Sequence, residues 1–100
     1  MSQLFFLSVA VAALLFLAPP VASAADPRLL AGSCTACHGM SGAGSGAMPA
    51  LKGRDAAGLA ALMRAFRDGS RPGTVMVRLS KGYTDAEIDA IAREIETGWR

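Results

Sequence analysis

The sequence predicts an all-α fold with three main helices. Two segments, residues 55–68 and 84–97, repeat apolar side chains every three or four positions, which is the spacing of one helix face. Both segments also carry residues that favour the start and the end of a helix at their limits. No segment shows the sustained alternation of apolar and polar residues that is typical of a strand. Another helix is expected ahead of these two, over residues 26–38, and is the first in the mature chain.

The start of the chain has the composition of an export signal. The first 25 residues contain no Asp, Glu, Lys or Arg, and residues 4–18 form an almost unbroken apolar run. Pro19-Pro20 ends this run, and Ala22-Ser23-Ala24 supplies the small residues of a cleavage site. We therefore expect a secretory signal over residues 1–24 and one mature domain over residues 25–100. The run is shorter than the ~20 residues that span a bilayer, so an uncleaved membrane anchor is the less favoured alternative.

The mature domain is small and nearly balanced in charge. All charged residues lie in it, and its formal net charge is +2. This balance favours neither a nucleic acid nor a membrane surface as a partner. A domain of this length buries only about 60% of the surface that its unfolded chain exposes. A further stabilising group is therefore expected.

The first mature helix is expected to begin at Asp26-Pro27. Asp26 is a favourable N-cap, and Pro27 suits the first helical position. The helix is expected to run into Cys34, Cys37 and His38 and to carry them on its last turn. The loop that follows, residues 39–53, is rich in glycine, which breaks any helical period.

The second and third helices are expected over residues 55–68 and 84–97. The second ends at Gly69, and its apolar face consists of Leu59, Leu62, Met63 and Phe66. Residues 70–82 are expected to be irregular, with a turn at Pro72-Gly73. The third begins with a capping-box pattern from Thr84 to Glu87, and its apolar face consists of Ile88, Ile91, Ala92 and Ile95. Gly98 is expected to end it, leaving Trp99 and Arg100 as a short tail.

Both cysteines and the only histidine lie within five consecutive positions, Cys34-Thr-Ala-Cys37-His38. This arrangement suits covalent haem attachment, because two thiols form thioethers with the vinyl groups and the adjacent imidazole reaches the iron. Three other uses are less favoured. A structural zinc site needs about four N or S ligands, a redox dithiol needs a βαβ context, and a plain disulfide leaves His38 unexplained.

The motif resembles that of the c-type cytochromes, and the mature chain resembles a small single-haem class I cytochrome c. The resemblance implies three main helices around one covalently bound haem c, attached to Cys34 and Cys37, with His38 on the iron. It also implies that a proline carbonyl in the following loop fixes the other ring nitrogen of His38, and Pro49 is the matching residue. Haem is attached to such motifs outside the bacterial cytoplasmic membrane, so the resemblance implies a periplasmic protein.

The second axial ligand is a methionine, a weaker donor or none, because the chain has no second histidine. Met76 is favoured, since it lies in the expected loop between the last two helices and reaches the distal face from there. Met40 follows His38 too closely, Met63 belongs to an apolar helix face, and Met48 lies in the glycine-rich loop. A His/Met pair favours ferrous iron and leaves no open coordination position.

Within this group the chain is most similar to the cytochrome subunit of flavocytochrome c sulfide dehydrogenases. The similarity spans roughly residues 26–97 and depends on the short first helix, on residues 59–69 and on the methionine segment, residues 74–84. It implies an electron-transfer subunit, not an enzyme in itself, which accepts electrons from an FAD-containing sulfide dehydrogenase subunit and passes them to a downstream acceptor. The chain departs from class I proteins where an aromatic pair usually joins the first and last helices, because Leu30 and Glu94 stand near those positions.

Two other functions remain open. One is a free-standing electron carrier between periplasmic dehydrogenases and a terminal oxidase. The other is a five-coordinate haem protein that binds gases or reduces peroxide, which requires Met76 to be off the iron. Five cations are candidates for a docking surface, although exposed charges are more often simply solvated: Arg64, Arg67, Arg71, Arg78 and Lys81.

Overall fold

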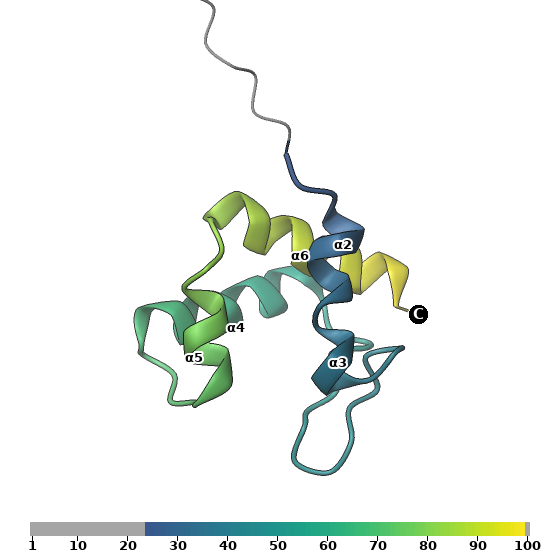
Figure 1. Ribbon diagram of the computed structural model, residues 1–100, viewed down its shortest axis with the longest axis horizontal. Coiled ribbons are helices and arrows are strands. Elements are labelled where there is room, and N and C mark those ends of the chain that lie inside the picture. The colour runs from purple at the N-terminus through teal and green to yellow at the C-terminus, as the bar shows by residue number, and fades with distance from the viewer. Residues whose placement is uncertain (1–23, 100) are drawn as a thin grey trace, which may run out of the picture.

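The computed structural model describes residues 24–99 and confirms the all-α prediction. Five helices lie in this part of the chain: α2 (Pro27–Gly32), α3 (Thr35–His38), α4 (Ala56–Asp68), α5 (Val75–Ser80) and α6 (Asp85–Gly98) (Figure 1). None of these helices is both long and apolar enough to cross a membrane. The expected secretory signal, apart from Ala24, lies outside the described residues.

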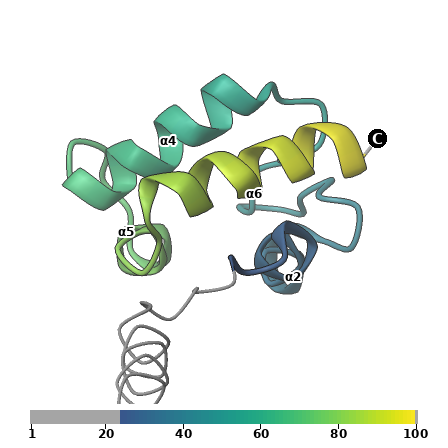
Figure 2. The same ribbon diagram turned by 90° about the horizontal axis from the view of Figure 1, so that it is seen from above.

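Helices α4 and α6 lie side by side and run in opposite directions, while α2 packs on α6 and α5 packs on α4 (Figure 2). The buried apolar side chains all come from α2, α4 and α6: Ala31, Leu59, Ala60, Met63, Ile88, Ile91, Ala92 and Ile95. The predicted apolar faces of the two long helices therefore meet each other. Leu30 also packs against this cluster, so aliphatic side chains join the first and last helices where class I proteins use an aromatic pair.

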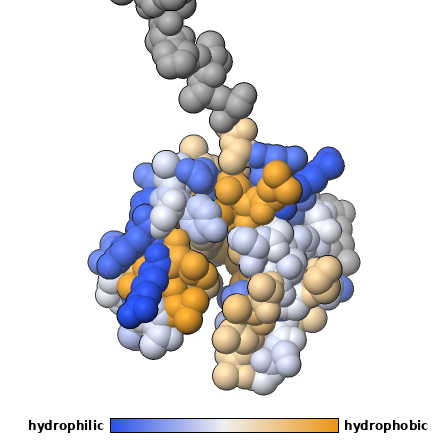
Figure 3. All heavy atoms as spheres, viewed as in Figure 1, coloured by the Kyte–Doolittle hydropathy of each residue, from blue (hydrophilic) through white to orange (hydrophobic). Residues whose placement is uncertain are grey.

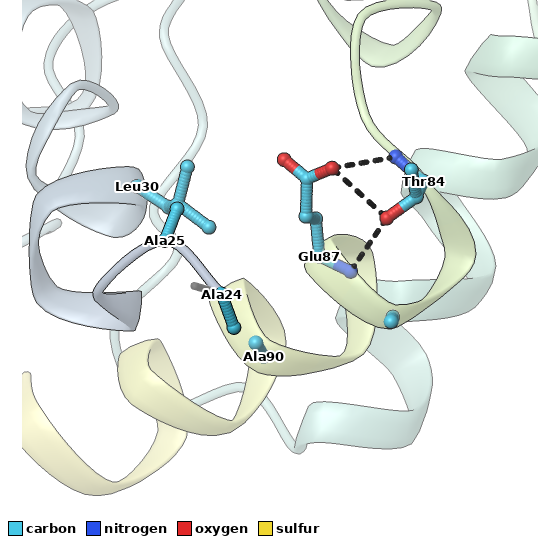
Figure 4. Close-up of a pocket in the computed structure, with 7 residues that line it drawn as sticks. Ala24, Ala25, Leu30, Thr84, Glu87 and Ala90 are labelled. Carbon is cyan, nitrogen blue, oxygen red and sulfur yellow. Dashed lines mark hydrogen bonds between the residues drawn. The ribbon is translucent and has the colours of Figure 1, made fainter. Parts of the chain in front are cut away.

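The predicted helix ends are confirmed where a side chain or a glycine determines them. The Asp26 carboxylate accepts a hydrogen bond of 2.9 Å from the N–H of Arg28 at the start of α2. Gly69 ends α4 with a left-handed φ of 82°, a conformation that glycine adopts without steric cost. Thr84 and Glu87 form the capping box of α6, and its reciprocal bonds are drawn in Figure 4.

The sequence predicted that the first helix runs unbroken through the cysteines, and this prediction is wrong. The helix ends at Gly32, and the chain turns through Ser33 and Cys34 before α3 begins at Thr35. The Ser33 hydroxyl donates to the carbonyl of Leu30 at 2.8 Å, and the Thr35 hydroxyl donates to that of Gly32 at 2.7 Å. Such local bonds compete with the helical ladder, and Gly32 adds little helical preference of its own. Cys34 therefore caps α3, while Cys37 and His38 lie on its last turn.

The expectation that residues 70–82 are irregular is wrong for Val75–Ser80, which form α5. This helix is placed by the segment before it. Residues 72–73 form no turn, in contrast to the prediction for Pro72-Gly73. A Cβ added at Gly73 would lie 3.0 Å from Cε1 of Phe66, so this segment lies directly on the Phe66 ring. The Arg71 guanidinium covers the same ring, 5.4 Å from its centroid. Met76 is consequently held on a short helix and not in an open loop.

Two of the five candidate docking cations form ion pairs within the fold. Arg64 contacts Asp85 at 3.0 Å and Asp89 at 2.9 Å, and Arg67 contacts Asp85 at 2.6 Å. Arg67 also donates to the carbonyl of Tyr83 at 3.2 Å. These bonds join α4 to the start of α6. Arg64 and Arg67 thus stabilise the packing of α4 on α6, and we no longer include them in the predicted docking surface.

Replacing Asp85 with Asn is expected to lower the midpoint of thermal unfolding by a few degrees at neutral pH. Hydrogen bonds from Arg67 and Arg64 hold the pKa of Asp85 below its ordinary value. A depressed carboxyl pKa stabilises the fold above the unfolded-state pKa, and this contribution is lost as the pH falls through the folded-state pKa. The loss of stability below about pH 4 should therefore be smaller in Asp85→Asn than in the wild type.

Thermal scans between pH 2 and pH 7 provide the measurement. Glu96→Gln is the matched control, since it removes one exposed carboxylate from the same helix. An acid limb that changes equally in both variants would contradict a specific role for the Asp85 pairs.

Candidate haem-binding site

The cysteine–histidine motif projects its three side chains from one short element. Cys34 is half-buried and packs against the core, Cys37 is exposed, and no disulfide joins the two. Burial raises the pKa of the Cys34 thiol, mainly through desolvation. His38, at the end of α3, is only 7% exposed. The core therefore anchors one end of the motif, while the second thiol remains accessible.

The His38 ring is fixed by a single backbone carbonyl. Its Nδ1 lies 2.7 Å from the carbonyl oxygen of Pro49. A carbonyl oxygen only accepts hydrogen bonds, so Nδ1 must carry the proton and donate it. In a neutral imidazole the other nitrogen, Nε2, then presents its lone pair. This is the tautomer that a histidine needs in order to bind a metal through Nε2.

The Pro49 carbonyl is presented by a loop that folds back on the motif. The N–H of Gly44 donates to the carbonyl of His38 at 2.8 Å. A Cβ added at Gly44 would lie 2.7 Å from the nitrogen of Ala50 and 2.8 Å from the carbonyl carbon of Pro49. Gly44 also has a φ of 74°, in the left-handed region. Glycine is therefore needed here both for its backbone conformation and for the approach of the Pro49 peptide.

A hollow separates this loop from helix α5. Helices α2, α4 and α6, which contain the buried apolar cluster, form the helical layer. Both α3 with its loop and α5 project from the same side of this layer (Figure 1). The space-filling view shows apolar surface on both sides of the hollow between them (Figure 3). Val75 and Leu79 on α5 are 53% and 51% exposed, and Met40 and Met48 on the loop are 87% and 43% exposed. These elements contribute no side chain to the buried apolar cluster.

The four mature methionines occupy four different settings. Met63 is buried in the core, as its helical spacing predicts. Met40 directly follows the motif, and Met48 directly precedes Pro49 in the loop that bonds to His38. Met76 is half-buried on α5, on the other side of the hollow. Among the described residues, Met76 is thus the methionine that comes from the wall opposite α3.

The donors and the shape of this region suit a covalently held haem. Two cysteine side chains and an Nε2 lone pair come from one short segment, and apolar surface lies on both sides of the hollow (Figure 3). A flat apolar group placed there would cover surface that the chain itself leaves exposed. The residues present therefore fit the group that the motif implies.

A second depression lies elsewhere, between the start of α2 and the start of α6 (Figure 4). It has a volume of about 420 Å³ and is lined by Ala24, Ala25, Leu30, Thr84, Ala86, Glu87 and Ala90. Its only charged side chain is that of Glu87, which is engaged in the helix cap. This depression contains no thiol, imidazole or thioether and plays no part in the site.

Comparison with known proteins identifies the family. The sequence model described as "Cytochrome C oxidase, cbb3-type, subunit III" matches residues 24–93. The chain belongs to this family of c-type cytochrome domains. Its fold and its thiol–imidazole motif agree with that membership, and the family binds haem c covalently. The class I resemblance drawn from the sequence is confirmed.

Several curated relatives are similar to this cytochrome. It is 40% identical over 65 residues to the "Cytochrome subunit of sulfide dehydrogenase" of Chlorobaculum tepidum, covering 65% of this chain and 59% of the relative. It is 41% identical over 88 residues to the "Thiosulfate dehydrogenase electron acceptor" of Thiomonas intermedia, covering 86% and 40%. It is also 38% identical over 65 residues to "Cytochrome c-554(548)" of Halomonas halodenitrificans, covering 61% and 78%. The matched region thus spans only about half the length of the first two relatives.

The contact between Trp99 and Gly42 was not anticipated from the sequence. Gly42 is buried with a φ of 68°, and an added Cβ would lie 2.9 Å from Cζ3 of Trp99 and closer still to Cε3. Trp99 is therefore no free tail, because its indole covers the loop that carries Pro49. The one available signal was that the only tryptophan of this cytochrome directly follows the last helix.

Replacing Gly44 with Ala is expected to weaken both the fold and the His38–Pro49 hydrogen bond. A left-handed alanine costs roughly 1–2 kcal/mol, and its Cβ would press on the Pro49 peptide. The measurements are denaturant unfolding of the haem-loaded cytochrome and the NMR signal of the His38 Nδ1 proton in the reduced state.

Gly46 provides the matched control. Its φ is 56°, and an added Cβ would meet no atom within 4 Å. Gly46→Ala should lose only the conformational part of the stability and should leave the His38 proton signal unchanged. Equal effects of the two alanines on that signal would contradict the assigned role of Gly44.

Proposed function

We propose that this cytochrome is a periplasmic electron-transfer protein that accepts electrons from a dehydrogenase partner, with a flavoprotein sulfide dehydrogenase subunit as the favoured donor. One haem c is attached to Cys34 and Cys37, and His38 and Met76 are the iron ligands. The observation that carries this proposal is the bond of 2.7 Å between Nδ1 of His38 and the Pro49 carbonyl. It leaves the other ring nitrogen of a nearly buried imidazole poised to bind iron. The haem supplies reversible one-electron exchange.

Met76 is favoured as the second ligand because it lies on α5, across the hollow from His38 on α3 (Figure 1). Pro49 bonds to the ring nitrogen of His38 that points away from the iron, and Met48 adjoins Pro49 on that same side. Met63 is buried in the core. Helix α5 stands across the hollow, and its position is fixed by packing on α4 and by the Phe66–Gly73 contact. A soft thioether from this wall favours the ferrous state and closes the site to other ligands.

The partner and the location are supported by the comparisons and by the expected leader. Two relatives are described as the cytochrome subunit of a sulfide dehydrogenase and as a thiosulfate dehydrogenase electron acceptor. Both descriptions fit a protein that receives electrons without acting on the sulfur compound itself. The apolar segment at residues 4–18 and its small-residue ending favour export. A protein that is not exported would contradict the periplasmic assignment.

A free-standing carrier is the second candidate function. The Halomonas halodenitrificans relative, 78% of which is covered, is described only as a cytochrome and not as a subunit of a dehydrogenase. Such a carrier would be reduced by several donors and would form no stable complex. Reduction with and without the flavoprotein therefore separates the two candidates.

The docking face is proposed to surround α5. Arg71, Arg78 and Lys81 are exposed and form no ion pair with residues 24–99, in contrast to Arg64 and Arg67. Arg78 lies on α5, the helix that carries Met76, while Arg71 precedes this helix and Lys81 follows it. An acidic rim on the partner would bring the redox centre close to the donor through this face.

Replacing Met76 with Ala is expected to open the distal position of the reduced cytochrome to carbon monoxide. The wild type should bind carbon monoxide slowly or not at all at neutral pH, because both axial positions are filled. Absorption spectra before and after addition of the gas provide the measurement. Met48→Ala is the control and should behave as the wild type does. Unchanged axial ligation in Met76→Ala would move the assignment to Met48.

Sulfide is expected to reduce the haem rapidly only when the flavoprotein subunit is present. Stopped-flow spectra of the cytochrome with sulfide, with and without that subunit, provide the measurement. Arg78→Glu should slow flavoprotein-dependent reduction by about tenfold at low salt. Arg93→Glu, which makes the same charge change at an exposed position of α6, is the control. Equally fast reduction without the flavoprotein would count against the proposed partner.

A further inference from the structure

Trp99 follows helix α6 directly, and its side chain is half-buried. The backbone N–H of Trp99 donates to the carbonyl of Ile95 at 3.2 Å, and its indole packs against the buried apolar cluster. The same ring lies on Gly42, where any Cβ atom would collide with Cε3 and Cζ3. Trp99 therefore contacts both the helical layer and the glycine-rich loop. An aromatic side chain buries a large area in such a position.

Gly42 is the point at which this loop closes. Its carbonyl accepts hydrogen bonds from the N–H of Leu51 at 2.8 Å and of Lys52 at 2.9 Å. Its own N–H donates to the carbonyl of Gly39 at 2.9 Å. The residue under the indole thus ties the beginning of the loop to its end. Displacement of Gly42 would therefore loosen both the beginning and the end of the loop.

Two further contacts lead from this closure to the imidazole. The N–H of Gly44 bonds to the carbonyl of His38 at 2.8 Å, and the Pro49 peptide lies directly against Gly44. The Pro49 carbonyl then accepts the bond from Nδ1 of His38 at 2.7 Å. Trp99 is therefore linked to the histidine ring by its contact with Gly42, by the two peptide bonds from Gly42 to Gly44, and by the contacts of Gly44 and His38 with Pro49.

We propose that Trp99 is a positioning residue for the axial imidazole, because it clamps the loop that holds the Pro49 carbonyl against His38. This inference rests on the proposed ligation of the iron by His38. An acceptor at Nδ1 makes the ligating nitrogen more basic, and a more basic ligand favours ferric iron. By holding this acceptor in place, Trp99 keeps the reduction potential lower than a loosened loop would.

Trp99→Ala in the haem-loaded protein is expected to raise the reduction potential. Loss of a residue that hydrogen-bonds to a metal ligand typically lowers metal affinity or activity by about tenfold or more. Trp99→Ala only loosens such a bond, so we expect the redox equilibrium constant of the haem to change by about three- to tenfold. A tenfold change corresponds to about 59 mV for one electron. Exchange of the His38 Nδ1 proton with solvent, followed by NMR in the reduced protein, should become faster. Trp99→Phe keeps a six-membered ring over Gly42 and should restore most of both properties.

Ile88→Val separates positioning from general stability. Ile88 is fully buried at the opposite end of α6, so the variant should unfold more easily while the potential and the proton exchange stay at the wild-type values. Shifts in Ile88→Val as large as those in Trp99→Ala would overturn the proposal. So would a folded Trp99→Ala protein whose potential and proton exchange match those of the wild type.

A double-mutant comparison tests the contact itself. Gly42→Ala should raise the potential when Trp99 is present and should have a smaller effect in the Trp99→Ala background, because the colliding ring is gone. Equal effects in the two backgrounds would overturn the proposal. If Trp99→Ala does not fold, Trp99→Phe and Gly42→Ala in the wild-type background carry the test. A wild-type spectrum without histidine ligation would refute the proposed function itself, which distinguishes that failure from failure of the clamp.

Discussion

The scarcity of interior is the constraint on which the rest of this cytochrome depends. The buried apolar side chains come from three helices and lie in one layer. Helix α3, the glycine-rich loop and α5 add none, although they carry exposed Val75, Leu79, Met40 and Met48. These elements therefore need a group from outside the polypeptide to cover them. A covalently attached porphyrin is such a group, and two thioether bonds would keep it in place.

The chain compensates for its small interior by using the backbone to hold the histidine. The imidazole of His38 is oriented by the Pro49 carbonyl, and the loop that presents this carbonyl is closed through Gly42 and Gly44. Glycine permits the close approaches that a side chain would block. Trp99 supplies the large apolar surface that these glycines lack. The surroundings of His38 are thus built from local hydrogen bonds and one aromatic ring that is distant in the sequence.

Sequence reasoning succeeded where the signal is local or periodic. The thiol–imidazole motif, the Asp26 and Thr84–Glu87 caps and the two apolar helix faces are all explicit in neighbouring residues. It was less successful where distant or competing contacts decide the structure. Helix α5 has six residues, too few to show a period, and the break before α3 depends on hydroxyl groups that compete for backbone carbonyls.

Contacts between residues far apart in the chain were missed for the same reason. Arg64 and Arg67 looked like free surface cations, because their partners Asp85 and Asp89 lie eighteen or more positions away. The packing of Trp99 on Gly42 likewise joins residues far apart in the chain, and no spacing rule predicts it. Both contacts follow from the crossing of the helices, which is a property of the whole fold.

The division between the helical layer and the segments attached to it has a consequence for how such proteins diversify. The layer holds itself together through Leu59, Met63, Ile88, Ile91 and Ile95, whereas the segments that face the prosthetic group contribute little to that cohesion. Substitutions in those segments can retune electron affinity and partner choice while the scaffold stays intact. One minimal framework can therefore be adapted to new donors through its peripheral positions alone.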